Sequence, residues 1–167
     1  RESVADALGV SEGFPAIVLI DFRGTVRKRI SREVPSLSKL RKTVLTFAKS
    51  NTAAATYARK IEKIIEEAEY AYQLKKRRVA IKKILPLDSP KERKRMDATL
   101  VKKMDEVLAR FRGDGKAMLD KVIALDAKRM WSKALDILEE LTREYPFPDL
   151  QREANRWRTT ILRKARG

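Results

Sequence analysis

The chain has 167 residues, of which 43% are apolar and 37% are charged, and its net charge is +16. The sequence contains neither cysteine nor histidine, which excludes thiolate chemistry, disulfides and histidine ligands or bases from these residues. No apolar run approaches the ~20 residues that a membrane-spanning helix needs. The positive charge is spread over the whole chain and favours anionic partners, namely nucleic acid, anionic lipid or an acidic protein.

The N-terminal part predicts a strand pair followed by a helix. Residues 16–21 are almost wholly apolar and rich in β-branched side chains, as in a strand buried on both faces. Arg23-Gly24 is a turn signal, and residues 25–30 alternate well enough for a wetter edge strand. An amphipathic helix is expected over residues 36–50. Its apolar stripe consists of Leu37, Leu40, Val44, Phe47 and Ala48.

This order of proline, strand, glycine turn, strand and helix resembles the second half of a thioredoxin-like domain of the TlpA thiol-disulfide oxidoreductase kind. The matching positions are Leu8-Gly9-Val10 at a helix end, Phe14-Pro15 at the cis-proline, Ile20-Asp21 at the strand end and Gly24 in the turn. The resemblance implies that Phe14 and Pro15 line a substrate groove. It also implies a bacterial envelope or periplasmic location; without it, the cytoplasm is the alternative.

The family's first half, which carries a Cys-x-x-Cys, has no room before Pro15. An apolar strand with an open edge requires a neighbour. We therefore expect the sheet to be completed by a segment upstream of Arg1, by a protein partner or by a second copy in a homo-oligomer.

Residues 51–112 predict a long basic helical hairpin. Asn51-Thr52 is a plausible cap for a helix over residues 53–85, which Pro86 ends. Ser89-Pro90 then begins a second helix that is expected to reach Phe111. The apolar stripe of the second helix is Met96, Leu100, Met104, Val107, Leu108 and Phe111.

Ten cations of this hairpin form a weak candidate surface for a polyanion such as nucleic acid. Since four of them are consecutive, they wrap around a helix, and a solvated face of mixed charge is the alternative interpretation. The ten are Lys75, Lys76, Arg77, Arg78, Lys82, Lys83, Lys91, Arg93, Lys94 and Arg95.

Residues 113–167 predict further helices. Arg112-Gly113-Asp114-Gly115 is expected to be a hinge, because two glycines flank an aspartate. Helices are then expected from Lys116, from Trp131 and from Leu150. Residues 131–146 resemble the second helix of a tetratricopeptide-type repeat, with Ala134 at the small-residue position and Tyr145-Pro146 at the closing turn. Trp131 and Trp157 are expected in the core; base stacking is the alternative for Trp157.

The sequence therefore predicts an α+β chain, predominantly α. Its parts are a thioredoxin-like ββα unit (1–50), a basic hairpin (51–112) and a tetratricopeptide-like antiparallel helical array (113–167). No catalytic residue, metal site or cofactor is predicted: Asp21 has no assignable second group, and Glu66-Glu67 and Glu139-Glu140 are neighbours that point apart.

Three functions remain open at this point. The first is a non-catalytic protein-interaction or scaffold module. The second is the C-terminal part of an oxidoreductase whose Cys-x-x-Cys lies upstream of Arg1. The third is polyanion binding through the basic helices.

Overall fold

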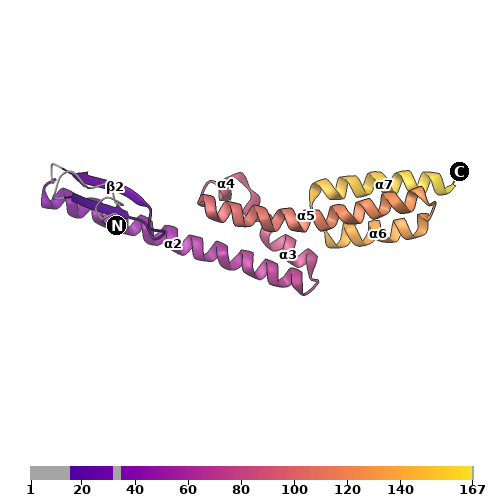
Figure 1. The fold of residues 1–167 in the computed structure, drawn as a ribbon, viewed down its shortest axis with the longest axis horizontal. Helices are drawn as coiled ribbons and strands as arrows, with labels where there is room; N and C mark the ends of the chain where they lie inside the picture. Colours follow the sequence, from indigo (N-terminus) through magenta and orange to yellow (C-terminus); the bar gives the residue numbers. More distant parts are fainter. Residues whose placement is uncertain (1–15, 32–34, 167) are drawn as a thin grey trace, which may run out of the picture. The chain divides into compact units, whose positions relative to one another are not determined.

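The computed structural model describes residues 16–31 and 35–166. In chain order the elements are β1 (Ala16–Ile20), β2 (Val26–Ser31), α2 (Leu37–Gln73), α3 (Arg77–Ile84), the 3-10 helix η1 (Leu85–Asp88), α4 (Pro90–Arg93), α5 (Ala98–Ala127), α6 (Trp131–Glu144) and α7 (Pro148–Arg166) (Figure 1). The predicted class, α+β and predominantly α, is confirmed. Contacts divide the chain into two compact units: an N-terminal unit, Arg1–Arg59, and a C-terminal unit, Lys60–Gly167.

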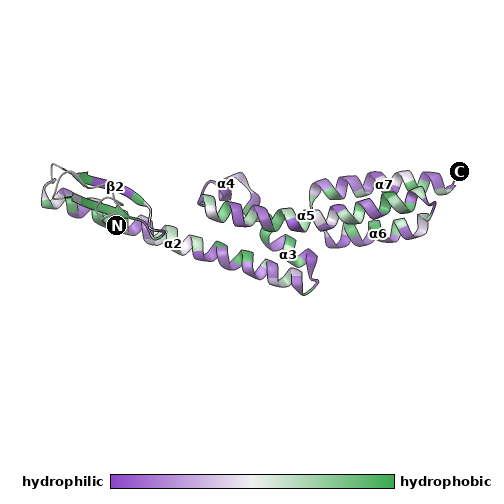
Figure 2. Ribbon diagram, in the orientation of Figure 1, coloured by the Kyte–Doolittle hydropathy of each residue, from purple (hydrophilic) through white to green (hydrophobic). Residues whose placement is uncertain are grey.

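In the N-terminal unit, β1 and β2 form the predicted antiparallel pair, with Ile17 opposite Ile30 and Leu19 opposite Lys28. β1 is hydrophobic along its whole length, whereas β2 mixes hydrophobic and hydrophilic residues (Figure 2). Gly24 makes the turn with φ +82°, a conformation that glycine adopts without a steric cost. Among the described strands, β1 pairs with β2 alone.

The first half of α2 lies alongside this strand pair (Figure 1). Leu40 and Phe47 are half-buried, as the predicted stripe requires. Leu37, Val44 and Ala48 were also placed in that stripe, and this part of the prediction is wrong because all three are exposed. Since a strand pair is narrower than a full sheet, it covers only a thin line of the helix.

The predicted break at residues 51–52 is also wrong, because α2 runs without interruption through it. Neither side chain is available as a cap. The amide of Asn51 accepts a hydrogen bond from the Phe22 backbone N–H at 3.0 Å, and the Thr52 hydroxyl donates to the Ala48 carbonyl at 2.9 Å. Both side chains are thus used along the helix rather than at an end.

Helix α2 ends earlier than predicted, at Gln73, and α3 follows as a separate helix. The Lys76 N–H donates to the Ala71 carbonyl and the Lys75 N–H to the Tyr72 carbonyl, at 3.0 and 2.9 Å. These two bonds make a Schellman ending, with Lys75 in the left-handed conformation (φ 60°) where glycine is usual.

The second helix of the hairpin is likewise divided. Ser89 caps α4 as predicted, since its Oγ accepts the Glu92 N–H at 3.4 Å, but α4 ends at Arg93. The Asp97 carboxylate then caps α5 by accepting the Leu100 N–H at 3.0 Å. The apolar stripe is nevertheless confirmed: Met96, Leu100, Met104, Val107, Leu108 and Phe111 are all buried.

The predicted hinge at residues 112–115 is wrong, because α5 continues through it to Ala127. Gly115 is buried, and a Cβ on it would lie 2.5 Å from the Leu150 Cδ1 atom and 3.2 Å from the Tyr145 Cδ1 atom. This glycine therefore allows close packing of other elements against α5 instead of bending the chain.

Helices α5, α6 and α7 pack side by side (Figure 1). The predicted helices from Trp131 and Leu150 are confirmed as α6 and α7. Trp131 is half-buried, and its indole N–H is enclosed without a hydrogen-bond partner. The fully enclosed side chains of this bundle include Phe111, Leu138, Leu141, Tyr145 and Phe147.

Candidate functional site

Helix α7 packs into the bundle on one side, is held to the end of α6 on a second, and is exposed on a third. Leu150, Ala154 and Ile161 recur at helical spacing and are buried, so they fix the side of the helix that joins the bundle. On one flank of this buried side, the Gln151 amide donates to the Thr142 and Tyr145 carbonyls, both at 2.9 Å. These two hydrogen bonds hold α7 against the end of α6. The remaining flank of the helix, which includes Asp149 and Glu153, is exposed.

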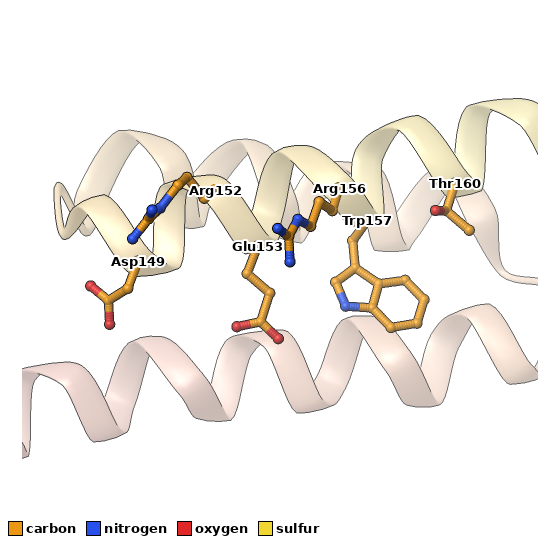
Figure 3. Close-up of a pocket in the computed structure, with 6 residues that line it drawn as sticks. All are labelled: Asp149, Arg152, Glu153, Arg156, Trp157 and Thr160. Carbon is orange, nitrogen blue, oxygen red and sulfur yellow. The ribbon is translucent and has the colours of Figure 1, made fainter.

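That remaining flank contains a hollow of about 570 Å³. All of its lining side chains come from α7, and Figure 3 shows Asp149, Glu153 and Trp157 projecting towards the neighbouring helix. We call this feature the α7 hollow. Its residues are Asp149, Arg152, Glu153, Arg156, Trp157 and Thr160.

The polar groups of the α7 hollow are only partly engaged within the chain. The Asp149 carboxylate lies 4.0 Å from the Arg112 guanidinium of α5, and the Arg152 Nε donates to the Pro148 carbonyl at 3.3 Å. Within the described residues, Glu153 and Arg156 form no ion pair. The charges of Glu153 and Arg156 are thus not neutralised by ion pairs in the described part of the chain.

Trp157 lines the same hollow, one residue after Arg156 and four after Glu153, and it is half-buried rather than enclosed in the core as expected. A ring that is partly covered by its own protein keeps a fixed orientation and still offers apolar area to a ligand. The α7 hollow therefore combines an aromatic surface with charges of both signs.

A second hollow, of about 440 Å³, lies between α3, α5 and α6 beside two tyrosines. The Tyr72 ring stacks on Phe111 with centroids 3.9 Å apart, and its hydroxyl donates to the Asp114 carboxylate at 2.6 Å. The Tyr145 hydroxyl is 3.3 Å from the Tyr72 hydroxyl, and Arg77 lies over the Tyr145 ring at 5.8 Å.

Both tyrosines stay protonated at neutral pH. Burial raises the pKa of Tyr72, and its hydrogen bond to Asp114 raises that pKa further. Burial also raises the pKa of Tyr145. The hydrogen bonds of the two phenols link the end of α2 to Asp114 of α5 and to the residue that follows α6.

The structure separates the ten predicted cations into two groups. Four form ion pairs: Arg77 with Glu140 at 3.5 Å, Lys83 with Glu67, Arg93 with Asp88 at 2.6 Å and also with Asp105, and Arg95 with Glu92 at 3.2 Å. The other six are exposed and form no ion pair within the described residues: Lys75, Lys76, Arg78, Lys82, Lys91 and Lys94. Six of the ten cations are therefore exposed without an ion pair in the described part of the chain, and the polyanion-binding surface stays a prediction.

Arg93 has a structural role. Its guanidinium bridges Asp88 of η1 and Asp105 of α5. These bonds raise the pKa of Arg93, and the hydrogen bond to Asp105 is the largest cause. The bridge fixes the short η1–α4 segment against the bundle.

Asp21 is held in the β1–β2 turn rather than in a reactive site. Its carboxylate accepts the Thr25 and Arg23 N–H groups, each at 2.9 Å, and the Arg27 Nε at 2.7 Å. These bonds lower the pKa of Asp21, with the Thr25 backbone bond as the largest cause. Within the described residues, no group of three or more acidic side chains could hold a metal ion, and no helix is long and apolar enough to cross a membrane.

Phe14 and Pro15, the groove residues implied by the thioredoxin resemblance, lie outside the described residues. No family model, curated protein or solved structure matches the chain. The thioredoxin-like and tetratricopeptide-like resemblances therefore stay predictions.

The sequence analysis considered Trp157 but missed the α7 hollow. One signal was present: Asp149, Glu153 and Trp157 recur every four residues, so they share one face of a helix. The Tyr72–Asp114–Tyr145 cluster had no such signal, because its members are 42 and 73 residues apart in the sequence.

Proposed function

We propose that the chain is a non-catalytic protein-binding module whose partner docks in the α7 hollow. In this proposal the strands and α2 form a thioredoxin-like half-domain, and α5–α7 form a helical scaffold. The observation that carries it is the half-buried Trp157, which lines the same hollow as Arg156 and Glu153, two charged side chains that form no ion pair within the described residues. Tryptophan and arginine are the side chains that most often dominate protein–protein binding energy.

The charges of the α7 hollow favour a polypeptide over a nucleic acid. The carboxylates of Asp149 and Glu153 line the same hollow as the two arginines, and they would repel a phosphate backbone. A polypeptide can instead place a basic side chain near Glu153, an acidic one near Arg156 and an apolar one on Trp157. The volume of about 570 Å³ is enough for a few such side chains.

The groups with shifted pKa values also support a non-catalytic role. Tyr72 and Tyr145 are kept neutral, and Asp21 is fully engaged by its own turn. A general base or nucleophile needs the opposite arrangement, namely a free group poised near the working pH.

The experiment is a selection of peptides from a random phage-displayed library against the purified chain. Recovered peptides are then titrated against the wild type, Arg156→Ala and Trp157→Ala. We expect each variant to bind about 30-fold more weakly or worse, since truncation of a central hot-spot residue costs about 2 kcal/mol or more.

The matched control is Arg158→Ala, which removes an exposed arginine of α7 that does not line the hollow. Its peptide affinities should equal those of the wild type. Recovery of peptides that bind all four proteins equally would place the docking surface elsewhere and overturn the proposal.

A further inference from the structure

In the part of the N-terminal unit that the structure describes, basic side chains far outnumber acidic ones. Its described residues, 16–31 and 35–59, include nine basic side chains and a single acidic one, Asp21. That carboxylate is already bound to Arg27 and to two backbone N–H groups of its turn. No carboxylate of this described part is therefore left to neutralise the cations of α2.

Three cations of α2 lie away from the half-buried Leu40 and Phe47. At about 100° per residue, Lys42 and Lys49 lie on the opposite face of the helix and Arg41 lies on the adjoining flank. This face is hollowed, with a volume of about 330 Å³. Its lining consists of Ser38, Arg41, Lys42, Leu45, Thr46 and Lys49, and we call it the α2 basic face.

The arrangement is unfavourable for a helix that stays alone. Lys39 and Lys42 are three residues apart and repel each other, and Lys39 lies in the first turn, where the helix dipole disfavours positive charge. The segment 37–59 contains five basic residues and no acidic residue that could form a compensating i,i+4 pair. A bound polyanion would offset this repulsion.

We propose that the α2 basic face binds the phosphate backbone of a nucleic acid. Arg41, Lys42 and Lys49 neutralise phosphates along about two turns of helix, roughly 10 Å. The hydroxyls of Ser38 and Thr46 supply further donors of the kind that contact phosphate and sugar oxygens. Leu45, which is 51% exposed, contacts the sugar or base between them.

A nucleic acid fits this face better than an anionic membrane does. A helix that lies in a membrane interface needs a broad apolar face. Leu40 and Phe47 of α2 are half-buried, and Leu45 is the one apolar side chain among the described residues that line the hollow. The exposed Leu37, Val44 and Ala48 lie on the flank between the hollow and these half-buried residues. This inference is independent of the proposed protein-binding function, because it rests on the other unit of the chain.

The test is fluorescence anisotropy with a labelled single-stranded oligonucleotide of about 20 nucleotides, titrated with the full chain at several salt concentrations. We expect the triple variant R41E/K42E/K49E to bind at least tenfold more weakly at low salt. The slope of log K against log salt should become shallower by about 2, which corresponds to three phosphate contacts at roughly 0.7 each.

The matched control is K102E/K116E/K133E, which makes the same change of charge at exposed residues of the C-terminal unit that lie outside both candidate surfaces. Equal loss in both triple variants would indicate a response to net charge alone and would overturn the inference. Unchanged binding by the α2 variant, or binding only to vesicles with anionic lipid, would overturn it too. The milder variant R41Q/K42Q/K49Q decides the matter if charge reversal lowers the helical content.

Discussion

Two glycines of α5 have different surroundings. A Cβ added at Gly113 would meet no atom within 4 Å, whereas one at Gly115 would meet Leu150 at 2.5 Å and the Tyr145 ring at 3.2 Å. Leu150 is the side chain that would have to move, and it is buried at 1% exposure in a closely packed interior. The same substitution therefore has opposite expected effects at two positions in one helix.

We expect Gly115→Ala to lower the free energy of unfolding. Overpacking costs about 1–3 kcal/mol, which exceeds the gain of up to ~1 kcal/mol from the helix propensity of alanine. Gly113→Ala should raise stability by about 0.5–1 kcal/mol, because only the propensity gain applies. Urea unfolding followed by helical circular dichroism measures both. Equal stabilisation by the two variants would show that Leu150 yields easily and that the contact does not matter.

Tyr72 predicts a dependence of stability on alkaline pH. Burial and the hydrogen bond to Asp114 raise its pKa in the folded chain, whereas an unfolded tyrosine titrates near 10. Above pH ~10 the unfolded state loses this proton and the folded state keeps it, so the folded state binds more protons. Stability contributed below pH ~10 is consequently lost as the pH rises further.

We therefore expect Tyr72→Phe to be less stable than the wild type by about 0.5–1.5 kcal/mol at neutral pH, the usual net value of one hydrogen bond. The difference should shrink as the pH rises from 9 to 11. Thermal unfolding at each pH provides the measurement, and Tyr70→Phe is the control because its ring is 64% exposed. A constant difference across that range would contradict the assignment.

At the scale of elements, helix endings explain much of what the sequence predicted and missed. Both strands, α6, α7 and the buried stripe from Met96 to Phe111 follow from periodicity and turn residues, and all were predicted. The boundaries of α2 and α3 were not. The α2 ending uses Lys75 in a left-handed conformation, and the α5 ending uses Arg129 (φ 57°), at positions where a reader of sequence looks for glycine.

At Gly113 and Gly115 of α5 the sequence pattern predicts a hinge, whereas the helix continues through them. Their role depends on Tyr145 and Leu150, which are distant in the sequence, so no local pattern could reveal it. The same reason explains why the tyrosine cluster escaped prediction. For the α7 hollow, spacing gave the shared helix face, but only the packing of the bundle decides which face stays open.

The end of α2, where Lys75 has a left-handed conformation, allows a further prediction. A lysine in the left-handed region costs about 1–2 kcal/mol relative to a right-handed one, and glycine avoids this cost. Part of the gain is offset because glycine has more conformational entropy in the unfolded chain. We expect Lys75→Gly to raise the free energy of unfolding by about 0.5–1 kcal/mol in urea titrations. The control is Lys76→Gly, because Lys76 has φ −86° and no strain to relieve. A larger gain at Lys76 than at Lys75 would refute this account of the ending.

At the scale of the whole molecule, burial is unevenly distributed. Among the described residues of the N-terminal unit, Leu19 and Ala58 are the buried apolar side chains, at 8% and 5% exposure. The C-terminal unit encloses many large side chains completely, among them Phe111, Phe147 and Leu141. A two-stranded hairpin is at best marginally stable by itself, so its hydrogen bonds should open far more often than those of the bundle.

We expect amide hydrogen exchange to be at least about tenfold faster in β1 and β2 than in the middle of α5, because a tenfold difference needs only 1.4 kcal/mol of local stability. Mass spectrometry of peptides from the intact chain gives the rates. Adding the oligonucleotide should slow exchange in residues 37–49, and adding a selected peptide should slow it in α7. Strand amides as protected as those of α5 in the chain alone would mean that another segment already covers the open edge of β1, and the prediction of a sheet that a partner completes would then fail.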